Sequence, residues 1–281
     1  MFRYKTLDNT NIEILHKVFV DAFSDYQVKM DLPIWKFEQM LQRRGYVAEM
    51  SIGAFENERL VGFILNGFRI WNGKLTVYDI GTGVIGEYRR QGITNHILSN
   101  VKKIIKEKQV EQYLLEVIKS NESAVELYKK QDFEFQRELE CFQMEKTKYN
   151  PIIIHEVEHV NKIDLNKLIH FWDFNPSWQN SIDSINAISE AFLYSIVRFD
   201  NTIVGYGIID KKTGDIPQIA INKNFRGNGI ARSIMTDLVK NTESSKISVL
   251  NIDEKSKSIQ NFLLKLGFEN SVTQYEMLLN T

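Results

Sequence analysis

The order of apolar and polar residues along the chain predicts a layered α/β protein. Apolar residues recur at helical spacing over 12–23 and 33–44. Between 51 and 80, runs of β-branched and aromatic residues alternate with turn residues, which is typical of strands. Asn72-Gly73 separates two of these runs and is typical of a tight hairpin turn. We therefore expect a short strand at 2–7, two helices and a three-stranded antiparallel meander.

The meander leads into a glycine-containing turn, after which the pattern becomes helical to about Lys108. A strand at 112–117 follows, then a helix to about residue 131 and two short strands at 133–137 and 141–145. A strand–helix–strand crossover of this length makes the two strands parallel neighbours.

The second half of the chain repeats this order after Tyr149-Asn150-Pro151. The glycine turns of the two copies lie 226 − 89 = 137 residues apart, which is a domain-sized repeat. We predict two domains, 1–148 and 149–281. For the second we expect a strand at 152–157, a helix at 165–171, a meander over 193–221 and final strands near 268 and at 274–279.

Each copy has a basic, glycine-containing turn between a strand and a helix. Backbone N–H groups in such a turn, together with the positive end of the following helix, make a site for phosphate oxygens. The two stretches are Arg89-Arg90-Gln91-Gly92-Ile93-Thr94 and Arg226-Gly227-Asn228-Gly229-Ile230-Ala231. We expect both to bind a polyanionic ligand.

Composition narrows the class of partner. Lys plus Arg number 35 against 36 Asp plus Glu, so no overall basic field attracts nucleic acid or an anionic membrane. The single Cys141 excludes an internal disulfide and fits a reducing compartment. There is no run of about 18 apolar residues to cross a membrane. We expect a cytoplasmic protein with neither a nucleic-acid nor a membrane partner.

One apparent metal motif is rejected. His155-Glu156-Val157-Glu158-His159 matches the His-Glu-x-x-His pattern of zinc proteases, which requires a helix. The preceding Ile152-Ile153-Ile154 is β-branched and predicts a strand, on which the two histidines would lie roughly 13 Å apart. We predict no metal site.

The element order and the two turns resemble the GNAT superfamily of acetyl-CoA-dependent N-acetyltransferases. Its pyrophosphate motif, Arg/Gln-x-x-Gly-x-Gly/Ala, is matched at 226–231, and at 89–94 with Thr94 in the last place. The stretch from Asn121 to Tyr128 resembles a second family motif, Asn-x-x-Ala-x-x-Leu-Tyr, whereas Leu263 stands at the tyrosine position of the second copy. The resemblance implies two tandem GNAT folds. Each is a mixed, mostly antiparallel sheet flanked by helices, with a parallel strand pair forming a wedge for CoA.

The resemblance also implies an activity, the transfer of an acetyl group from acetyl-CoA to a primary amine of a small molecule or peptide. Tyr128 would protonate the departing thiolate, and Glu116 is preferred over Asp79 as the general base. The N–H of Val84 would polarise the thioester carbonyl. The residues expected at the CoA site are Val84, Ile85, Arg89, Arg90, Gln91, Gly92, Ile93, Thr94, Asn121 and Ala124.

Two alternatives stay open. The first is a non-catalytic acyl-CoA-binding or interaction protein. The second is an enzyme whose catalysis takes place in the second domain. Because Leu263 cannot donate a proton, the second copy is expected to be degenerate. Its turn at 226–231 is a possible second CoA site. A monomer or a homodimer is expected, and no motif encodes the acceptor.

Overall fold

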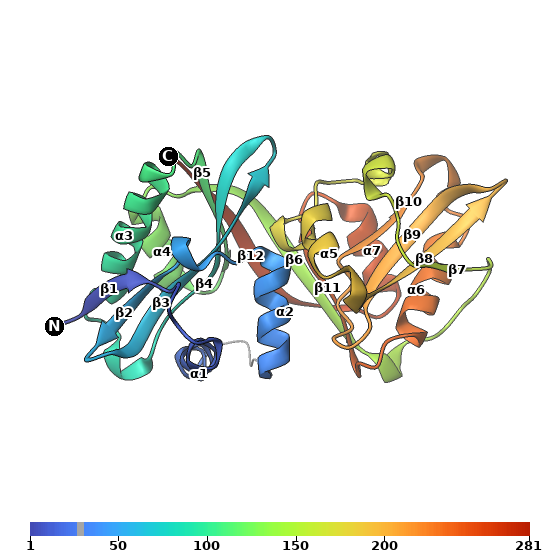
Figure 1. Ribbon diagram of the computed structural model, residues 1–281. Coiled ribbons are helices and arrows are strands. Elements are labelled where there is room, and N and C mark those ends of the chain that lie inside the picture. Colours follow the sequence, from blue (N-terminus) through green and yellow to red (C-terminus); the bar gives the residue numbers. More distant parts are fainter. Residues whose placement is uncertain (27–30) are drawn as a thin grey trace. The chain divides into compact units, whose positions relative to one another are not determined.

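The computed structural model describes residues 1–26 and 31–281 (Figure 1). The strands are β1 (Arg3–Thr6), β2 (Ile52–Glu56), β3 (Arg59–Trp71), β4 (Lys74–Val84), β5 (Gln112–Ile118), β6 (Glu134–Glu145), β7 (Glu158–Val160), β8 (Phe192–Phe199), β9 (Thr202–Asp210), β10 (Gln218–Ile221), β11 (Lys246–Asp253) and β12 (Glu269–Asn280). The α-helices are α1 (Ile12–Ala22), α2 (Ile34–Arg44), α3 (Ile93–Glu107), α4 (Glu122–Lys130), α5 (Ile182–Ala187), α6 (Ile230–Lys240) and α7 (Lys257–Lys265).

The chain forms two compact units, and neither is one continuous segment. Unit 1 consists of residues 1–116, 128–135 and 277–281, and unit 2 of residues 117–127 and 136–276. The end of β12 thus belongs to unit 1, where the N–H of Thr281 donates to the carbonyl of Glu111 at 3.1 Å. The predicted boundary between residues 148 and 149 marks the sequence repeat and stays a prediction.

Helices cover both faces of the sheet of unit 1. Its strands follow the order β1-β2-β3-β4-β5 and are antiparallel except for the β4–β5 pair. A Cβ added at Gly62 would meet Ile93 of α3, whereas one added at Gly81 would meet Phe19 of α1. Gly81 pairs with Leu65 of β3 and therefore faces the same side of the sheet as Leu65. Leu65 lies three residues from Gly62, and residues an odd number apart on a strand face opposite sides, so Gly62 and Gly81 do as well. Helices α1 and α3 therefore lie on opposite faces (Figure 1).

The parallel pair of unit 1 is short. Its register ends where Tyr78 meets Leu114, although β4 continues to Val84. A bulge follows directly, because Gly81 and Asp79 pair with consecutive residues of β3 and leave Ile80 as the extra residue. Bulges bend and twist a strand. The bulge expected near the glycines of β4 is thus present, one residue before Gly81.

Unit 2 contains two groups of strands. One is the antiparallel sheet β10-β9-β8-β7, and in the other β6 lies between β12 and β11. Helix α6 packs on the first sheet, where Ile234 would contact a Cβ added at Gly205 or Gly207 (Figure 1). A parallel bridge between Asp215 and Ser248 joins the residues before β10 to β11.

The fold class predicted from the sequence is confirmed: a mixed α/β protein with mostly antiparallel strands and a parallel pair. The hairpin at Asn72-Gly73 is also confirmed, since both residues have positive φ angles, of 50° and 80°. Such angles are what a type I′ hairpin turn requires.

The strand expected at 152–157 is not formed, so this prediction was wrong. The N–H of Ile152 donates to the hydroxyl of Thr236 at 3.1 Å, and those of Ile154 and His155 donate to the hydroxyl of Ser233 at 2.9 and 3.0 Å. Hydroxyl groups of α6 therefore accept hydrogen bonds from the backbone N–H groups that would otherwise pair with a neighbouring strand. The strand β7 begins only at Glu158.

Three further elements differ from expectation. The closing strands expected at 133–137 and 141–145 are one strand, β6, because Leu139 and Glu140 also pair with β11. The strands expected near 268 and at 274–279 are likewise one, β12. The helix expected at 165–171 is two 3₁₀ turns, since Leu168 between them has a φ of −112°.

Candidate active site

The first phosphate turn presents unused backbone donors. Gly92 has a φ of 75° and caps α3, which begins at Ile93. Within the described chain, the N–H groups of residues 90–94 donate to no other protein group. A left-handed glycine at a helix start, followed by free N–H groups, is suited to phosphate oxygens.

The two arginines of this turn have different surroundings. Arg89 forms an ion pair with Asp25, at 2.6 Å, and this hydrogen-bonded pair lowers the pKa of Asp25. Arg90 is exposed and has no side-chain partner in the part of the chain that the structure describes. Arg90 is therefore the arginine whose guanidinium is available to an anion.

Tyr128 and Asp79 form a buried pair in unit 1. The phenol of Tyr128 on α4 donates to Oδ2 of Asp79 on β4 at 3.1 Å, and the hydroxyl of Thr82 donates to the same oxygen at 2.6 Å. Both Tyr128 and Asp79 are 7% exposed. The other carboxylate oxygen, Oδ1, is buried and accepts no hydrogen bond from the described residues. A buried acceptor of this kind is costly unless a ligand supplies the donor.

Burial changes the acidity of both groups. It raises the pKa of Asp79 to about 6, against hydrogen bonds from Thr82, Tyr128 and the backbone of Gly81 and the positive charge of Arg44, which lower it. Burial, with the nearby Asp79 carboxylate, holds the pKa of Tyr128 well above its ordinary value. At neutral pH, Asp79 is thus mostly ionised and able to accept a proton, while Tyr128 retains its own.

Glu116 lies on β5 next to another phenol. Burial and the negative charge of Glu116, which accepts a hydrogen bond from Tyr78, hold the pKa of Tyr78 well above its usual range. The preference for Glu116 over Asp79 as the base stays a prediction. Tyr78 contacts the Glu116 carboxylate, and Oε1 of Glu116, like Oδ1 of Asp79, is buried and accepts no hydrogen bond from the described residues.

Val84 points its backbone N–H away from β3. The N–H of the next residue, Ile85, donates to Val61 at 3.0 Å, so the pair of Val84 and Gly62 is the non-hydrogen-bonded type. Beyond Tyr78 no register joins β4 to β5 among the described residues. This orientation is the one that the expected interaction with a thioester carbonyl requires.

Asn121 and Ala124 lie at the start of α4. The Asn121 side chain accepts hydrogen bonds from the Ala124 N–H at 3.3 Å and from the Ser123 hydroxyl at 3.0 Å. Both residues belong to the segment 117–127, which forms part of unit 2, whereas Tyr128 belongs to unit 1. Their contact with CoA stays a prediction.

Unit 2 contains a cavity of about 370 Å³ beside its own phosphate turn. The walls are the diverging strands β10 and β11, the turn residues Arg226, Gly227 and Gly229, and one side of α7. Gly227 and Gly229 both have a φ of 82°. Pockets of 300–1,000 Å³ are typical of small-molecule and cofactor sites. The second copy therefore keeps a formed cavity where the sequence indicates only a motif.

Leu263 does not line this cavity. It is completely buried in the hydrophobic core of unit 2, and its neighbour Phe262 lines the wall instead. The tyrosine in the wall is Tyr206 of β9, whose hydroxyl accepts from Trp172 at 2.7 Å and donates to Gln218 at 2.8 Å. Burial raises the pKa of Tyr206 far above its ordinary value. No sequence motif identified this residue, because it comes from the meander.

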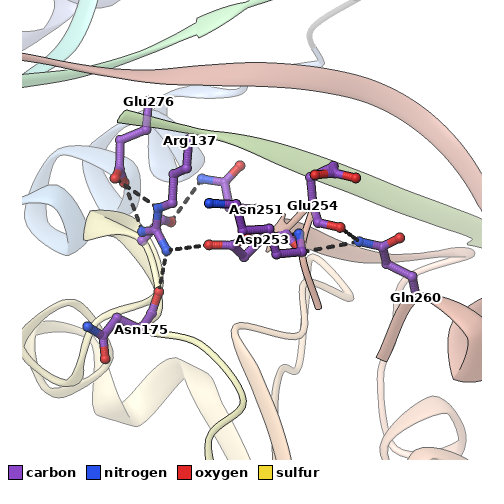
Figure 2. A network of polar contacts seen from close by, with 9 residues as sticks. Arg137, Asn175, Asn251, Asp253, Glu254, Gln260 and Glu276 are labelled. Carbon is purple, nitrogen blue, oxygen red and sulfur yellow. Dashed lines mark hydrogen bonds and ion pairs between the residues drawn. The ribbon is translucent and has the colours of Figure 1, made fainter. Parts of the chain in front are cut away.

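A buried ionic network supports the cavity wall (Figure 2). Arg137 of β6 donates two hydrogen bonds of 2.9 Å to Glu276 and contacts Asp253 at 3.4 Å. It also donates to the carbonyl of Asn175 at 2.7 Å, in the loop before Pro176, which lines the cavity. The strands expected at 133–137 and 274–279 contain Arg137 and Glu276, but their periodicity did not indicate that these charged side chains meet.

The histidines of the rejected zinc motif are held apart. His155 contacts the carbonyl of Asn228 at 2.6 Å, and His159 contacts Asp237 at 2.8 Å. No group of three or more His, Cys, Asp or Glu residues within 1–26 and 31–281 is arranged to hold a metal ion. In the same residues, no helix is long and apolar enough to cross a membrane.

Comparisons with known proteins match both halves of the chain. Residues 13–133 match a family model described as Acetyltransferase (GNAT) family, and residues 172–277 match one described as Acetyltransferase (GNAT) domain. A search of curated proteins finds no match.

Solved structures resemble the chain over its whole length. A GCN5-related N-acetyltransferase from Sphaerobacter thermophilus is 12% identical, with a TM-score of 0.75 over 99% of this chain and 95% of that one. A tandem GNAT protein from the clavulanic acid biosynthesis pathway is 10% identical, with a TM-score of 0.75 over 100% and 98%. A putative acetyltransferase from Pyrococcus horikoshii is 19% identical, with a TM-score of 0.70 over 100% and 89%. At these identities the likeness is one of fold.

Proposed function

The chain belongs to the GNAT family of acetyltransferases and carries two domains of that family, and from this premise we propose that unit 1 transfers an acetyl group from acetyl-CoA to a primary amine. The observation that carries the proposal is the buried Tyr128–Asp79 pair with its unsatisfied Oδ1. In the same unit, the turn at 90–94 offers free N–H groups to a pyrophosphate.

The chemistry assigned to these residues balances protons. The acceptor attacks as the neutral amine, and the nitrogen, which becomes positively charged on attack, gives one proton to Asp79 through Oδ1. The N–H of Val84 stabilises the negative charge that develops on the thioester oxygen. As the carbon–sulfur bond breaks, Tyr128 donates its phenolic proton to the thiolate. Asp79, now protonated and hydrogen-bonded to Tyr128, returns a proton to the phenolate.

Asp79 is proposed as the base in place of the sequence-based preference for Glu116. Its support is the hydrogen bond to the proposed acid, Tyr128, and a pKa raised to about 6, close to working pH. Glu116 also has a buried oxygen that accepts nothing from the described residues, and it lies next to Tyr78. A base held next to the general acid also explains why Tyr128 faces a carboxylate.

The test is thiol release from acetyl-CoA in the presence of a panel of primary amines. We expect Asp79→Asn and Tyr128→Phe each to lower kcat/KM roughly 10²–10⁴-fold, while Glu116→Gln has a smaller effect. Unchanged rates in Tyr128→Phe would remove that residue as the acid. A larger loss in Glu116→Gln than in Asp79→Asn would restore Glu116 as the base.

A second candidate function is CoA binding in unit 2, and the cavity of about 370 Å³ favours it. Arg232, in the first turn of α6, lines this cavity, and its buried Nε has no hydrogen-bond partner among the described residues. A cationic group beside free turn amides suits a phosphate. Tyr206 is then the hydroxyl to test as an acid, with Tyr206→Phe in the same thiol-release assay.

Charge balance and cysteine content bear on the partners and the location of the protein. We infer a small-molecule or peptide amine as acceptor, no nucleic-acid or membrane partner, and a monomer or homodimer in the cytoplasm. The support is the balanced charge and the single cysteine, Cys141, which is buried and reduced.

A further inference from the structure

The first arginine of each phosphate turn makes the same set of contacts in both units. In unit 1, Arg89 donates from Nε to the carbonyl of Val84 at 3.0 Å and from Nη2 to the carbonyl of Ala22 at 2.8 Å. It also donates to both carboxylate oxygens of Asp25, at 2.6 and 2.7 Å. The guanidinium thus joins the end of β4 to the residues at the end of α1.

Unit 2 repeats this arrangement with different sequence around it. Arg226 donates from Nε to the carbonyl of Ile221 at 3.2 Å, from Nη2 to that of Phe171 at 2.9 Å, and from Nη1 to Asp173 at 2.9 Å. In both units the Nε acceptor lies five residues before the arginine, at the end of the strand that enters the turn. A contact set that appears twice in one chain reflects a shared requirement of the turn.

These contacts occupy the groups that would bind a phosphate. A guanidinium has five N–H donors in a fixed fork. Four hydrogen bonds engage Arg89, and the carboxylate of Asp25 neutralises its charge. Arg89 therefore has one N–H, on Nη1, that donates to no group of the described chain, and its charge is already paired. Arg90, next to it, has no such partner among the described residues.

We propose that Arg89 and Arg226 are positioning residues, which hold the free N–H groups of their turns in place and are not themselves phosphate ligands. The proposal rests on CoA binding as proposed above, and it gives Arg90 the role of phosphate contact in unit 1. It also couples the turn to α1, because Ala22 is the last residue of that helix and Asp25 lies three residues beyond it.

Substitution of the carboxylate separates the two roles of Arg89. If Arg89 were a phosphate ligand, Asp25→Asn would free its charge and tighten CoA binding. If Arg89 positions the turn, Asp25→Asn weakens CoA binding, by about fivefold for the loss of a pair of this kind. Salt gives a second contrast, since a charge that meets phosphate makes affinity fall with salt. Arg90→Ala should reduce that salt dependence, whereas Arg89→Ala should leave it unchanged.

The experiment is hydrogen–deuterium exchange of the full-length protein, read at the peptides covering 85–94 and 222–231, with and without added CoA. Protection of each peptide against CoA concentration yields a separate Kd for each turn. We expect weaker binding at 85–94 in Asp25→Asn, and at 222–231 in Asp173→Asn. Equal or tighter binding in either variant would overturn the proposal for that turn.

Hydrogen–deuterium exchange measured without CoA tests the positioning role of Arg89 independently of CoA binding. The N–H groups of Tyr88 and Arg89 are hydrogen-bonded within the turn, at 2.9 and 3.2 Å. Asp25→Asn and Arg89→Ala should speed exchange there at least severalfold, while Arg90→Ala should not. Unchanged exchange would overturn the positioning role even if CoA binds. Faster exchange with no CoA binding to wild type would uphold the positioning role and reject the proposed function.

Discussion

Tyr128 and Asp79 lie 49 positions apart in the chain, yet the phenol of one donates to the carboxylate of the other at 3.1 Å. Both side chains are almost completely buried, and one oxygen of Asp79 has no donor among the described residues. Burial of a carboxylate without full hydrogen bonding disfavours its charged form. This relationship makes Asp79 a group whose ionisation affects both stability and catalysis.

The stability of the protein should depend on pH through Asp79. Its pKa rises from 3.8 in the unfolded chain to about 6 in the folded one. Between these values the folded state holds a proton that the unfolded state has lost, so the free energy of unfolding falls as pH rises through this window. The full effect is about 3 kcal/mol, present below pH 4 and lost above pH 6. Urea denaturation across this range checks it. The fall should be smaller in Asp79→Asn than in wild type, and equal slopes would contradict the assignment.

Thr82 should tune the same group. Its hydroxyl donates to Asp79 at 2.6 Å and lowers the pKa of that carboxyl. We expect Thr82→Val to raise the pKa of Asp79, so that the rise of kcat/KM with pH moves to higher pH. Thr82→Ser keeps the hydroxyl and should keep the wild-type profile. The prediction fails if the valine variant titrates at or below the wild-type pH.

Glycine substitutions should distinguish the two turns. Gly92 has a φ of 75°, and a Cβ added there would meet only Cδ2 of His96, at 4.0 Å, among the described residues, so Gly92→Ala is strained by about 1 kcal/mol through its backbone and places a methyl group where phosphate would approach. At Gly229, an added Cβ would also meet Cδ1 of Ile154 at 2.4 Å. We therefore expect Gly92→Ala to weaken CoA binding in unit 1 alone, and Gly229→Ala in unit 2 alone.

Two controls accompany the glycine series. Gly86→Ala, in the same loop as Gly92 but with open space and no positive φ, should bind CoA like wild type. Adding Ile154→Ala to Gly229→Ala should relieve the steric part of the defect. Equal losses from Gly86→Ala and Gly92→Ala, measured by calorimetry with CoA, would count against the phosphate-turn assignment.

The Arg137 network should be a major contributor to the stability of unit 2. Arg137, Asp253 and Glu276 have side chains that are 15%, 14% and 9% exposed. Arg137→Met leaves two buried carboxylates without their cation and should destabilise the protein by about 3–5 kcal/mol. The double variant Arg137→Met/Glu276→Leu should lose less, because it removes a carboxylate too. The measurement is the free energy of unfolding in urea, and a double variant less stable than the single one would disprove the account.

Local features of the chain were predictable to the extent that they depend on near neighbours. The hairpin at Asn72-Gly73 and the helix starts at Gly92 and Gly229 follow from backbone preferences of a few residues. The strand expected at 152–157 was wrong because hydroxyls of α6, 78–84 positions away, accept from its backbone. Intrinsic β-propensity depends on the residue types of the segment itself, so it does not reflect hydrogen-bond acceptors that lie far away in sequence.

By itself, the sequence determined most of the element order, the repeat at 137 residues and the two turns at 89–94 and 226–231. These follow from periodicity and from residue types that act over one turn or one hairpin. Tertiary structure decided which polar groups meet: Tyr128 with Asp79, and Arg89 with Asp25. It also decided that unit 2 encloses a cavity next to its turn. The reason is physical, because burial and hydrogen-bond partners depend on chain segments that only folding brings together.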